Sequence, residues 1–307
     1  MQQPGQTHIQ LDDLLRTQSQ LLAAYQPGRK ADSHSMLAGL QHISQRGRSM
    51  EFDHSRIYQQ GDDVRNIDWR VSARTGKLHS KVFQQERERP VLLLIEQSPA
   101  LCFASRGNFM SVQAAYLASY FAWLAYNNHD RISGLIFAEQ PLCQIKSRRS
   151  QQAVLRLLYE LSLANQKLRE PASCRQNPLS TALSHGARLL RPSSLIILIC
   201  AQQHLQQQHI EPIRALGKKH DLILAPISDP MQHSLPTSKQ LIFYQRRQYL
   251  SLNSKTAAAQ HWQQQFDQRQ QLWQQLARQS RAAFLPISTA SSISTQLAAL
   301  ARNRFAP

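Results

Sequence analysis

Residues Gly47 to Ile95 read GRSMEFDHSRIYQQGDDVRNIDWRVSARTGKLHSKVFQQERERPVLLLI. The part up to Pro90 is dense in charged and aromatic side chains, whereas Val91 to Ile95 is continuously apolar and bounded by proline and charge. Such a run is typical of a strand that is covered on both faces. We therefore expect a polar layer that leads directly into the first strand of a buried sheet.

The polar layer contains three short β-prone pieces, which are Arg56–Tyr58, Ile67–Val71 and Leu78–Phe83. Turn-like runs around Gly61 and Gly76 separate them. This spacing predicts a small antiparallel hairpin layer. Eight residues form its structural signature: Tyr58, Gly61, Asp62, Asp63, Arg65, Asp68, Trp69 and Arg74.

Charge within this layer is balanced, because the chain carries seven acids and eight bases between Glu51 and Pro90. Acids and arginines alternate in its centre, and no nucleophile with a positioned base accompanies them. This pattern favours bidentate ion pairs over acid–base catalysis. We expect Trp69 to anchor the layer by burying its ring. The alternating residues are Asp62, Asp63 and Asp68 with Arg65, Arg70 and Arg74.

Apolar strands alternate with helical stretches along the rest of the chain. The expected strands are Val91–Ile95, Arg131–Phe137, Leu195–Cys200, Leu222–Ile227 and Ala282–Ile287, with Pro141–Ile145 as an edge strand. The expected helices are 11–22 (ended by Pro27 and Gly28), Ser111–Tyr126, Ser150–Leu163, Asn177–Leu190, Ile210–Lys219, a Gln-rich helix with Trp262 and Trp273 on one buried stripe, and Ser292–Ala301. This alternation predicts an α/β fold with a doubly wound, mostly parallel sheet of the Rossmann type.

We predict one main domain, which a chain of 307 residues is long enough to build around a full core. Residues 1–46 are assigned to an N-terminal helical extension. Residues 47–90 form the hairpin layer, packed on the core, and residues 91–307 form the α/β domain.

The formal net charge of +17 and the pI near 10.3 point to an acidic partner, an anionic surface or nucleic acid. Nearly all of the excess lies beyond residue 90, in small scattered clusters such as Arg246/Arg247. We favour a dispersed basic surface over a nucleic-acid footprint, because no arginine and aromatic module of a known binding fold is present.

Several classes of protein lack support in this sequence. The four cysteines form no CxxC pair, which argues against a zinc knuckle or redox pair. No GxSxG, P-loop, HExxH or GxGxxG motif is present, so we expect no enzyme and no cofactor. The N-terminus does not resemble a signal peptide, and the apolar runs are too short to span a bilayer, so we expect a cytoplasmic protein.

Polar residues follow the predicted strands at the edge where ligands bind on doubly wound sheets. Glu96 and Ser98 follow the first strand, Asn177 precedes a helix, and Ala201–His204 and Asp229 follow later strands. A carboxylate and hydroxyls from such loops would together form an oxygen-lined Mg²⁺ site. This edge is the predicted location of any site.

The stretch from Gly47 to Ser98 resembles the signature of the domain of unknown function 58 family, most specifically in GDDVRNIDWRVSARTGK. Further similar segments follow in the same order, namely FASRGNFMSVQAAYLASYFAWLA, HDRISGLIF and SDPMQHSLP. The resemblance covers the chain from about Leu37 to its closing helix. It implies a von Willebrand factor A-like core and a partnership with a MoxR-type AAA+ ATPase in the assembly or maturation of other proteins.

The resemblance also implies a place for a metal-ion-dependent adhesion site of the form DxSxS. Here Glu96 replaces the aspartate, Ser98 matches, and Ala100 occupies the second serine position. Asn177 stands where a threonine is expected, and Ala201 stands about where a distal aspartate is expected. The loss of charge and of ligands predicts a degenerate site, Glu96, Ser98 and Asn177, that does not hold Mg²⁺.

We therefore predict a non-enzymatic protein-interaction module that serves as adaptor or co-chaperone of a MoxR-type ATPase. Two alternatives remain open, a basic nucleic-acid-binding protein and a Mg²⁺-dependent adhesion-type site at the first strand end. The expected interaction surface consists of Glu96, Ser98, Phe103, Arg106 and Asp229.

Overall fold

The structure is a computed structural model that describes residues 5–24, 51–59, 62–84, 88–169, 176–236, 241–245, 248–252 and 257–303. The chain divides into two compact units. The smaller is Gln45–Glu88, and the larger combines Met1–Ser44 with Arg89–Pro307.

Seven described strands form the central sheet of the larger unit, in the order β10-β7-β6-β3-β4-β5 with β11 also beside β7. All neighbours are parallel except the pair β4 and β5. This confirms the expected mostly parallel sheet and the edge strand. The strands are β3 (Pro90–Glu96), β4 (Arg131–Phe137), β5 (Pro141–Arg148), β6 (Leu195–Ala201), β7 (Asp221–Ser228), β10 (Ala283–Phe284) and β11 (Ile287–Ser288).

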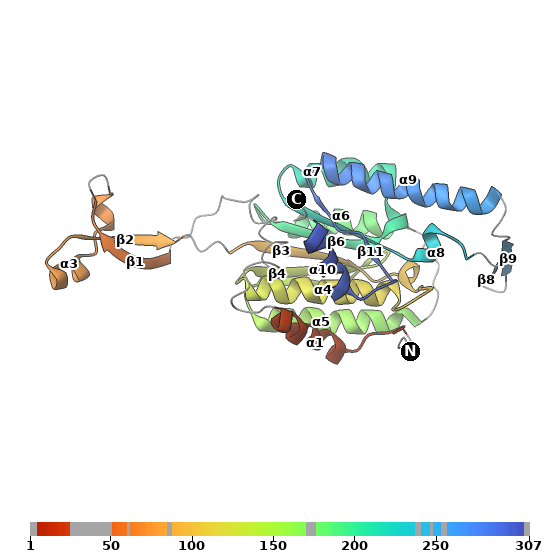
Figure 1. Cartoon of the computed structure of the whole chain (residues 1–307), viewed down its shortest axis with the longest axis horizontal. Coiled ribbons are helices and arrows are strands. Elements are labelled where there is room, and N and C mark those ends of the chain that lie inside the picture. The colour runs from red at the N-terminus through yellow and green to blue at the C-terminus, as the bar shows by residue number, and fades with distance from the viewer. Residues whose placement is uncertain are drawn as a thin grey trace. The chain divides into compact units, whose positions relative to one another are not determined.

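Helices cover both faces of this sheet (Figure 1). On one face lie α1 (Leu11–Ala24), α4 (Met110–Asn127), α5 (Gln151–Gln166) and α10 (Ile293–Asn303). On the other lie α6 (Pro178–Leu189), α7 (Gln207–Gly217) and α9 (Ala257–Gln279). Short helical turns are η2 (Pro99–Leu101), η3 (Lys167–Arg169), η4 (Gln202–His204) and α8 (Pro230–His233).

The apolar run after Pro90 explains this layering. Val91 and Leu93 face the helices α1, α4 and α5, while Leu92 and Leu94 face α6, α7 and α9, and all four are buried. A strand that is covered on both faces must be apolar at every position, because successive side chains point to opposite faces. The doubly wound prediction is confirmed.

Counted from β3, the strand order is 3-2-1-4-5-6, the order of a doubly wound sheet. The order reverses between β3 and β6, whose carboxyl ends are Glu96 and Ala201. A crevice for ligands forms at this point in such sheets. The fold therefore places Glu96, Ser98 and Ala201–His204 at its switch point, and Asp229 at the end of the next strand, β7.

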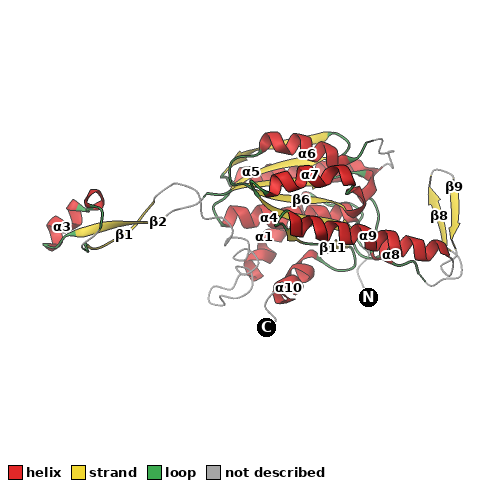
Figure 2. Cartoon of the chain, turned by 90° about the horizontal axis from the view of Figure 1, so that it is seen from above, coloured by secondary structure: helices red, strands yellow, loops and turns green. Residues whose placement is uncertain are grey.

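The last third of the chain differs from the expected pattern in three places. Trp273 is fully buried and donates its ring N–H to the Gln202 carbonyl at 2.9 Å. Trp262 is partly exposed beside α8. The prediction that both tryptophans lie on one buried stripe of the helix was therefore wrong. The helix α9 extends beyond the sheet toward α8 (Figure 2), which leaves the first tryptophan at the margin. The strand 282–287 is split into β10 and β11 around Leu285 and Pro286. An unexpected hairpin forms a separate two-stranded sheet of β8 (Leu241–Gln245) and β9 (Gln248–Leu252).

The N-terminal helix α1 belongs to the larger unit, where Leu14 is fully buried. The Thr17 and Ser119 hydroxyls lie 2.6 Å apart between α1 and α4. The predicted end of this helix at Pro27 and Gly28 lies outside the described residues. No described helix has the length and apolarity needed to cross a membrane.

The described residues of the smaller unit form an antiparallel hairpin, β1 (Glu51–Ile57) with β2 (His79–Gln84), and two short helices, η1 (Val64–Asn66) and α3 (Trp69–Thr75). The predicted strand at Ile67–Val71 is wrong. Asp68 caps α3 by accepting the Val71 N–H at 3.2 Å, and Gly76, at φ 69°, ends it in the left-handed conformation. These caps override the β propensity of the β-branched and aromatic residues between them. The packing of this unit on the core remains a prediction.

The aspartates Asp62, Asp63 and Asp68 accept hydrogen bonds from the backbone and do not pair with the central arginines. Asp62 pairs with Arg56 at 2.5 Å, and the Gln59 N–H lowers its pKa most strongly. The Ser55 hydroxyl, at 2.8 Å, lowers the pKa of Asp68.

Asp63 caps η1 by accepting the Arg65 N–H at 3.0 Å. The Tyr58 hydroxyl donates to the Asp62 carbonyl at 3.3 Å. Within the described ranges, the Arg65, Arg70 and Arg74 side chains make no ion pair, so the predicted bidentate pairs are wrong. Trp69 is 66% exposed, so the smaller unit by itself does not bury its ring. Gly61 lies outside the described residues.

Candidate functional site

Glu96 lies at the centre of the strand-end site. Its carboxylate is fully buried and accepts the Ala201 N–H at 2.9 Å and the Ser98 hydroxyl. The Nδ1 atom of His204 lies 3.0 Å from one carboxylate oxygen. Because a carboxylate only accepts hydrogen bonds, this nitrogen must carry the proton. Three donors from two strand ends therefore surround the acid.

The next residue, Gln97, connects the end of β3 to the helices α4 and α5 by hydrogen bonds. It is fully buried, donates to the Ser111 carbonyl of α4 at 3.0 Å, and accepts from the Asn165 amide of α5 at 3.0 Å. The Asn165 oxygen accepts the N–H of Ile9 at 2.9 Å. A chain of amides thus joins β3, both helices and the N-terminal segment.

Asp229 joins three loops at the same edge of the sheet. Its buried carboxylate accepts the Ser105 N–H at 2.7 Å, the Met231 N–H at 2.8 Å and the Thr289 hydroxyl. The predicted capping role of this aspartate is confirmed, and it extends to a loop more than a hundred residues away. The loop after β3 is therefore fixed to the ends of β7 and β11.

Gly107 shows how closely this loop is fitted. Its φ of 70° lies in the left-handed region, and a Cβ added there would come within 2.3 Å of the Thr289 carbonyl oxygen. Only glycine avoids both the strain and the overlap. Nearby, the Phe109 N–H donates to the Gln6 carbonyl at 3.0 Å, which fixes the end of the loop.

The five residues of the predicted interaction surface fall into two groups. Glu96, Ser98 and Asp229 are buried, so they support the loops from inside. Phe103, 38% exposed, and Arg106 are on the outside of the fixed loop. Only these two can contact a partner directly.

The oxygen atoms of the strand-end site are not arranged to bind Mg²⁺. The oxygens of Glu96 and Asp229 already accept hydrogen bonds from backbone and side-chain donors. Asn177 caps α6 by accepting the Leu179 N–H at 2.9 Å and donates to the His204 carbonyl at 2.8 Å. An Mg²⁺ ion needs several free oxygen ligands in octahedral geometry. No group of three or more His, Cys, Asp or Glu residues suited to a metal occurs in the described part of the chain.

Magnesium, manganese and chelator at millimolar concentrations are expected to leave Tm unchanged. A ligand at 100 times its Kd adds about 2.7 kcal/mol to native stability, which in a domain of this size raises Tm by roughly 5–10 °C. Differential scanning calorimetry of the full chain makes the comparison. A rise of several degrees with Mg²⁺ that Glu96→Gln abolishes would show that the acid binds the ion.

Ser180 and His209 make a second polar pair nearby, with Oγ and Nε2 at 2.8 Å. His209 Nδ1 accepts the Gln206 N–H at 3.1 Å, so in the neutral ring the proton is on Nε2 and points to the hydroxyl. Burial lowers the pKa of His209, which favours that neutral form. The histidine therefore cannot take the proton of Ser180 in this arrangement.

Cys200 is fully buried at the end of β6, and burial raises the pKa of its thiol well above the usual value. A buried, protonated thiol is a poor nucleophile. The predicted role of Cys200 as a small core residue is confirmed.

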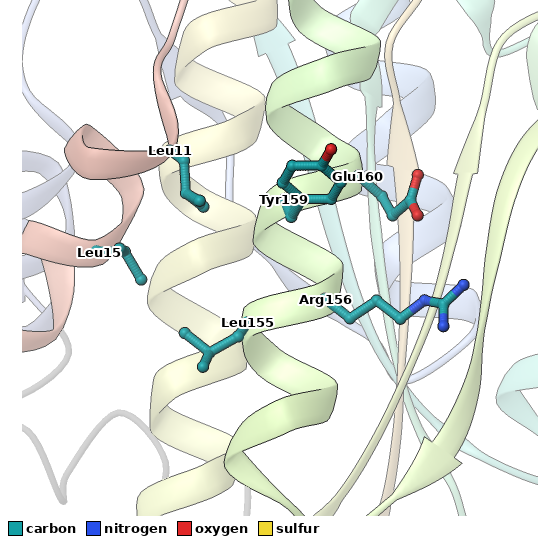
Figure 3. A pocket seen from close by; sticks show the side chains of 6 residues that line it. All are labelled: Leu11, Leu15, Leu155, Arg156, Tyr159 and Glu160. Carbon is teal, nitrogen blue, oxygen red and sulfur yellow. The ribbon is translucent and has the colours of Figure 1, made fainter.

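An apolar groove lies between α1 and α5 (Figure 3), with a volume of about 570 Å³. Leu11 and Leu15 line it from α1, and Leu155 and Tyr159 from α5, while Arg156 and Glu160 point away from α1. No nucleophile or paired carboxylates line it, so it lacks the groups for reaction chemistry.

The signature of the family described as "Protein of unknown function DUF58" matches residues 54–275, which include both the smaller unit's helices and the strand-end site. The chain belongs to the DUF58 family. The sequence-based resemblance is therefore confirmed.

Curated relatives of this DUF58 protein include uncharacterized proteins of Mycobacterium tuberculosis and Mycobacterium bovis. Each is 27% identical over 191 residues, which cover 62% of this chain. The matched region spans 58% of the length of these relatives.

Two solved structures resemble the fold. The conserved hypothetical protein BatB from Bacteroides thetaiotaomicron aligns with a TM-score of 0.45 at 12% identity, over 70% of this chain and 97% of that one. A von Willebrand factor type A protein from Catenulispora acidiphila aligns with a TM-score of 0.31 at 11% identity, over 49% and 35%. With scores this low, the assignment of a von Willebrand factor A-like α/β core rests on the strand order and the family.

The sequence did not single out Gln97, Asn165, His204 or Thr289 as individual site residues. Of these, only His204 could have been identified from the sequence pattern, because it ends the polar run Ala201–His204 that directly follows a predicted strand. Gln97 and Asn165 stand in apolar or helical surroundings that give no sign of their bond. Their roles follow only from the contacts.

Proposed function

We propose that this protein is a non-enzymatic adaptor or co-chaperone of a MoxR-type AAA+ ATPase, acting in the cytoplasm in the assembly or maturation of other proteins. The von Willebrand factor A-like fold of a DUF58 protein is compatible with a protein-interaction module. The absence of a free nucleophile–base pair among the described strand-end residues supports a role in binding rather than catalysis.

One observation carries the proposal. The loop after β3 is held at Ser105 by Asp229 and at Phe109 by Gln6, and it exposes Arg106 between these points. Phe103, two residues before Ser105, is also exposed, and its carbonyl accepts the Met110 N–H at 3.1 Å. A fixed loop loses little conformational entropy on binding, and aromatic and arginine side chains dominate protein interfaces. This loop has the features of a docking surface.

Phe103→Ala/Arg106→Ala is expected to weaken ATPase binding at least roughly tenfold, since interface aromatics and arginines each contribute more than about 1 kcal/mol. Co-purification and surface plasmon resonance with a MoxR-type ATPase from the same cell would measure this in the ATP, ADP and nucleotide-free states. The matched control is Arg156→Ala/Tyr159→Ala on α5. Failure of the wild type to bind in every nucleotide state would overturn the partnership, and equal loss in both variants would overturn the location.

A further inference from the structure

We propose that the turn-and-helix segment Asp62–Leu78 of the smaller unit docks on an anionic phospholipid surface. This goes beyond the adaptor role and involves different residues. The segment contains η1, α3 and the turn that leads to β2.

The first observation is its free positive charge. Arg65, Arg70, Arg74 and Lys77 are exposed, and none of them forms an ion pair or a side-chain hydrogen bond within the described residues. Arg70 and Arg74 lie one helical turn apart on α3, which puts their charges on the same side.

The acids of the same segment do not offset this charge at close range. Asp63 and Asp68 accept backbone N–H groups at the starts of η1 and α3, and Asp62 is taken by Arg56. These bonds hold each carboxylate against its own turn or hairpin, although Asp63 itself is exposed. The sequence is balanced in formal charge, but in the folded segment the three aspartates have local partners while the side chains of the four basic residues have none among the described residues.

The second observation is exposed apolar surface beside these bases. Trp69 is 66% exposed, and Ile57, Val64 and Leu78 are also exposed. These are large side chains that a small unit would bury if it had a core of its own to place them in. The other described residues of the smaller unit leave these side chains uncovered, which is typical of a surface that contacts an apolar partner.

Contacts bring three of these side chains to one end of the hairpin. The Asp68 N–H donates to the His79 carbonyl at 2.8 Å, so Trp69 and Leu78 each adjoin this bond. His79 pairs across the hairpin with Ile57. Figure 1 shows α3 at this end of β1 and β2.

A lipid surface accounts for both observations. Tryptophan and aliphatic side chains enter the headgroup and acyl boundary, while arginine and lysine meet anionic headgroups. The phosphates of a single-stranded nucleic acid would pair with the basic side chains, and its nucleobases would stack on Trp69. Such a ligand would leave Ile57, Val64 and Leu78 in water. The combination of one indole with three aliphatic residues favours lipid.

Co-sedimentation of the full chain with large unilamellar vesicles tests this. Vesicles with 30% phosphatidylglycerol in phosphatidylcholine are expected to bind the protein, phosphatidylcholine alone to bind it weakly, and 0.5 M NaCl to release it. Arg70→Gln/Arg74→Gln is expected to reduce the partition coefficient roughly 30-fold, because each base near the surface contributes about fivefold. Trp69→Ala is expected to reduce it roughly tenfold.

The control is Lys218→Gln/Lys219→Gln, which removes the same net charge from the end of α7 and should bind almost as the wild type does. The exposed, unpaired positions of Trp69, Arg70 and Arg74 mean that these variants should keep the wild-type Tm, which calorimetry verifies. Equal binding to both vesicle types, or equal loss in the control, would overturn the proposal. A single-stranded oligonucleotide bound in a way that depends on Trp69 and Arg70, with no vesicle binding, would instead assign the surface to nucleic acid.

Discussion

Glu96→Ala is expected to lower the free energy of unfolding by about 3–5 kcal/mol, because it leaves two buried donors and one partly buried donor without an acceptor. These donors are the Ala201 N–H, the Ser98 hydroxyl and His204 Nδ1. The truncation also opens a cavity at the end of β3, which adds to the loss. For a domain of this size the change corresponds to a fall in Tm of roughly 10 °C, measurable by calorimetry.

Two further variants distinguish the effect of losing the carboxylate from the effects of losing side-chain volume and of removing an acid in general. Glu96→Gln keeps the shape and one acceptor oxygen, so it is expected to cost roughly half as much. Glu211→Ala removes an exposed acid whose ion pair with Arg214 lies on the surface, and it is expected to cost less than about 0.5 kcal/mol. A Tm for Glu96→Ala within two degrees of the control, on this roughly 10 °C scale, would show that these donors find other partners.

Asp229→Ala is expected to cost about 3 kcal/mol and to release the loop after β3. It removes a buried carboxylate that accepts the partly buried Ser105 N–H and Met231 N–H and the buried Thr289 hydroxyl. Hydrogen exchange followed by mass spectrometry should show faster exchange in the loop that carries Phe103 and Arg106. If that loop is the docking surface, partner affinity should fall with it, since the bound conformation is less populated.

The matched control is Asp267→Ala, because Asp267 is half exposed and lies 3.7 Å from His233. A change of less than about 0.5 kcal/mol is expected there. If Asp229→Ala left both the Tm and the rate of hydrogen exchange in the loop unchanged, the conclusion that this carboxylate holds the loop in place would be refuted.

Much of the fold could be predicted from residue patterns alone. The apolar runs at Val91–Ile95 and Leu195–Cys200 predicted central strands, since burial on both faces requires apolar residues at every position. Long helical stretches were also predicted correctly to within a few residues, and the structure shows that Ser150 and Asn177 cap two of them. Errors arose where local capping overrode strand propensity, as at Asp68, and where a helix ran past the core, as at Trp262.

The candidate site was predicted correctly at the carboxyl ends of the strands. The prediction of which of its residues are exposed and which are buried was wrong. Glu96 and Asp229 both follow strands, which sequence order shows directly. Whether a carboxylate faces outward or accepts buried N–H groups depends on which loops lie next to it. Asp63 and Asp68 of the signature segment follow the same rule, because they accept backbone N–H groups at the starts of η1 and α3 and form no ion pair with the predicted arginines.

The sequence by itself determined the doubly wound sheet, because strand order and burial depend on apolar pattern and on short connections. The tertiary structure alone decided the chemistry of the strand ends. Glu96 meets His204 across 108 residues of chain, and Ser105 meets Asp229 across 124. Such contacts form only when parallel strands bring their carboxyl ends to one edge, and there the buried carboxylates accept hydrogen bonds from the protein in place of a metal.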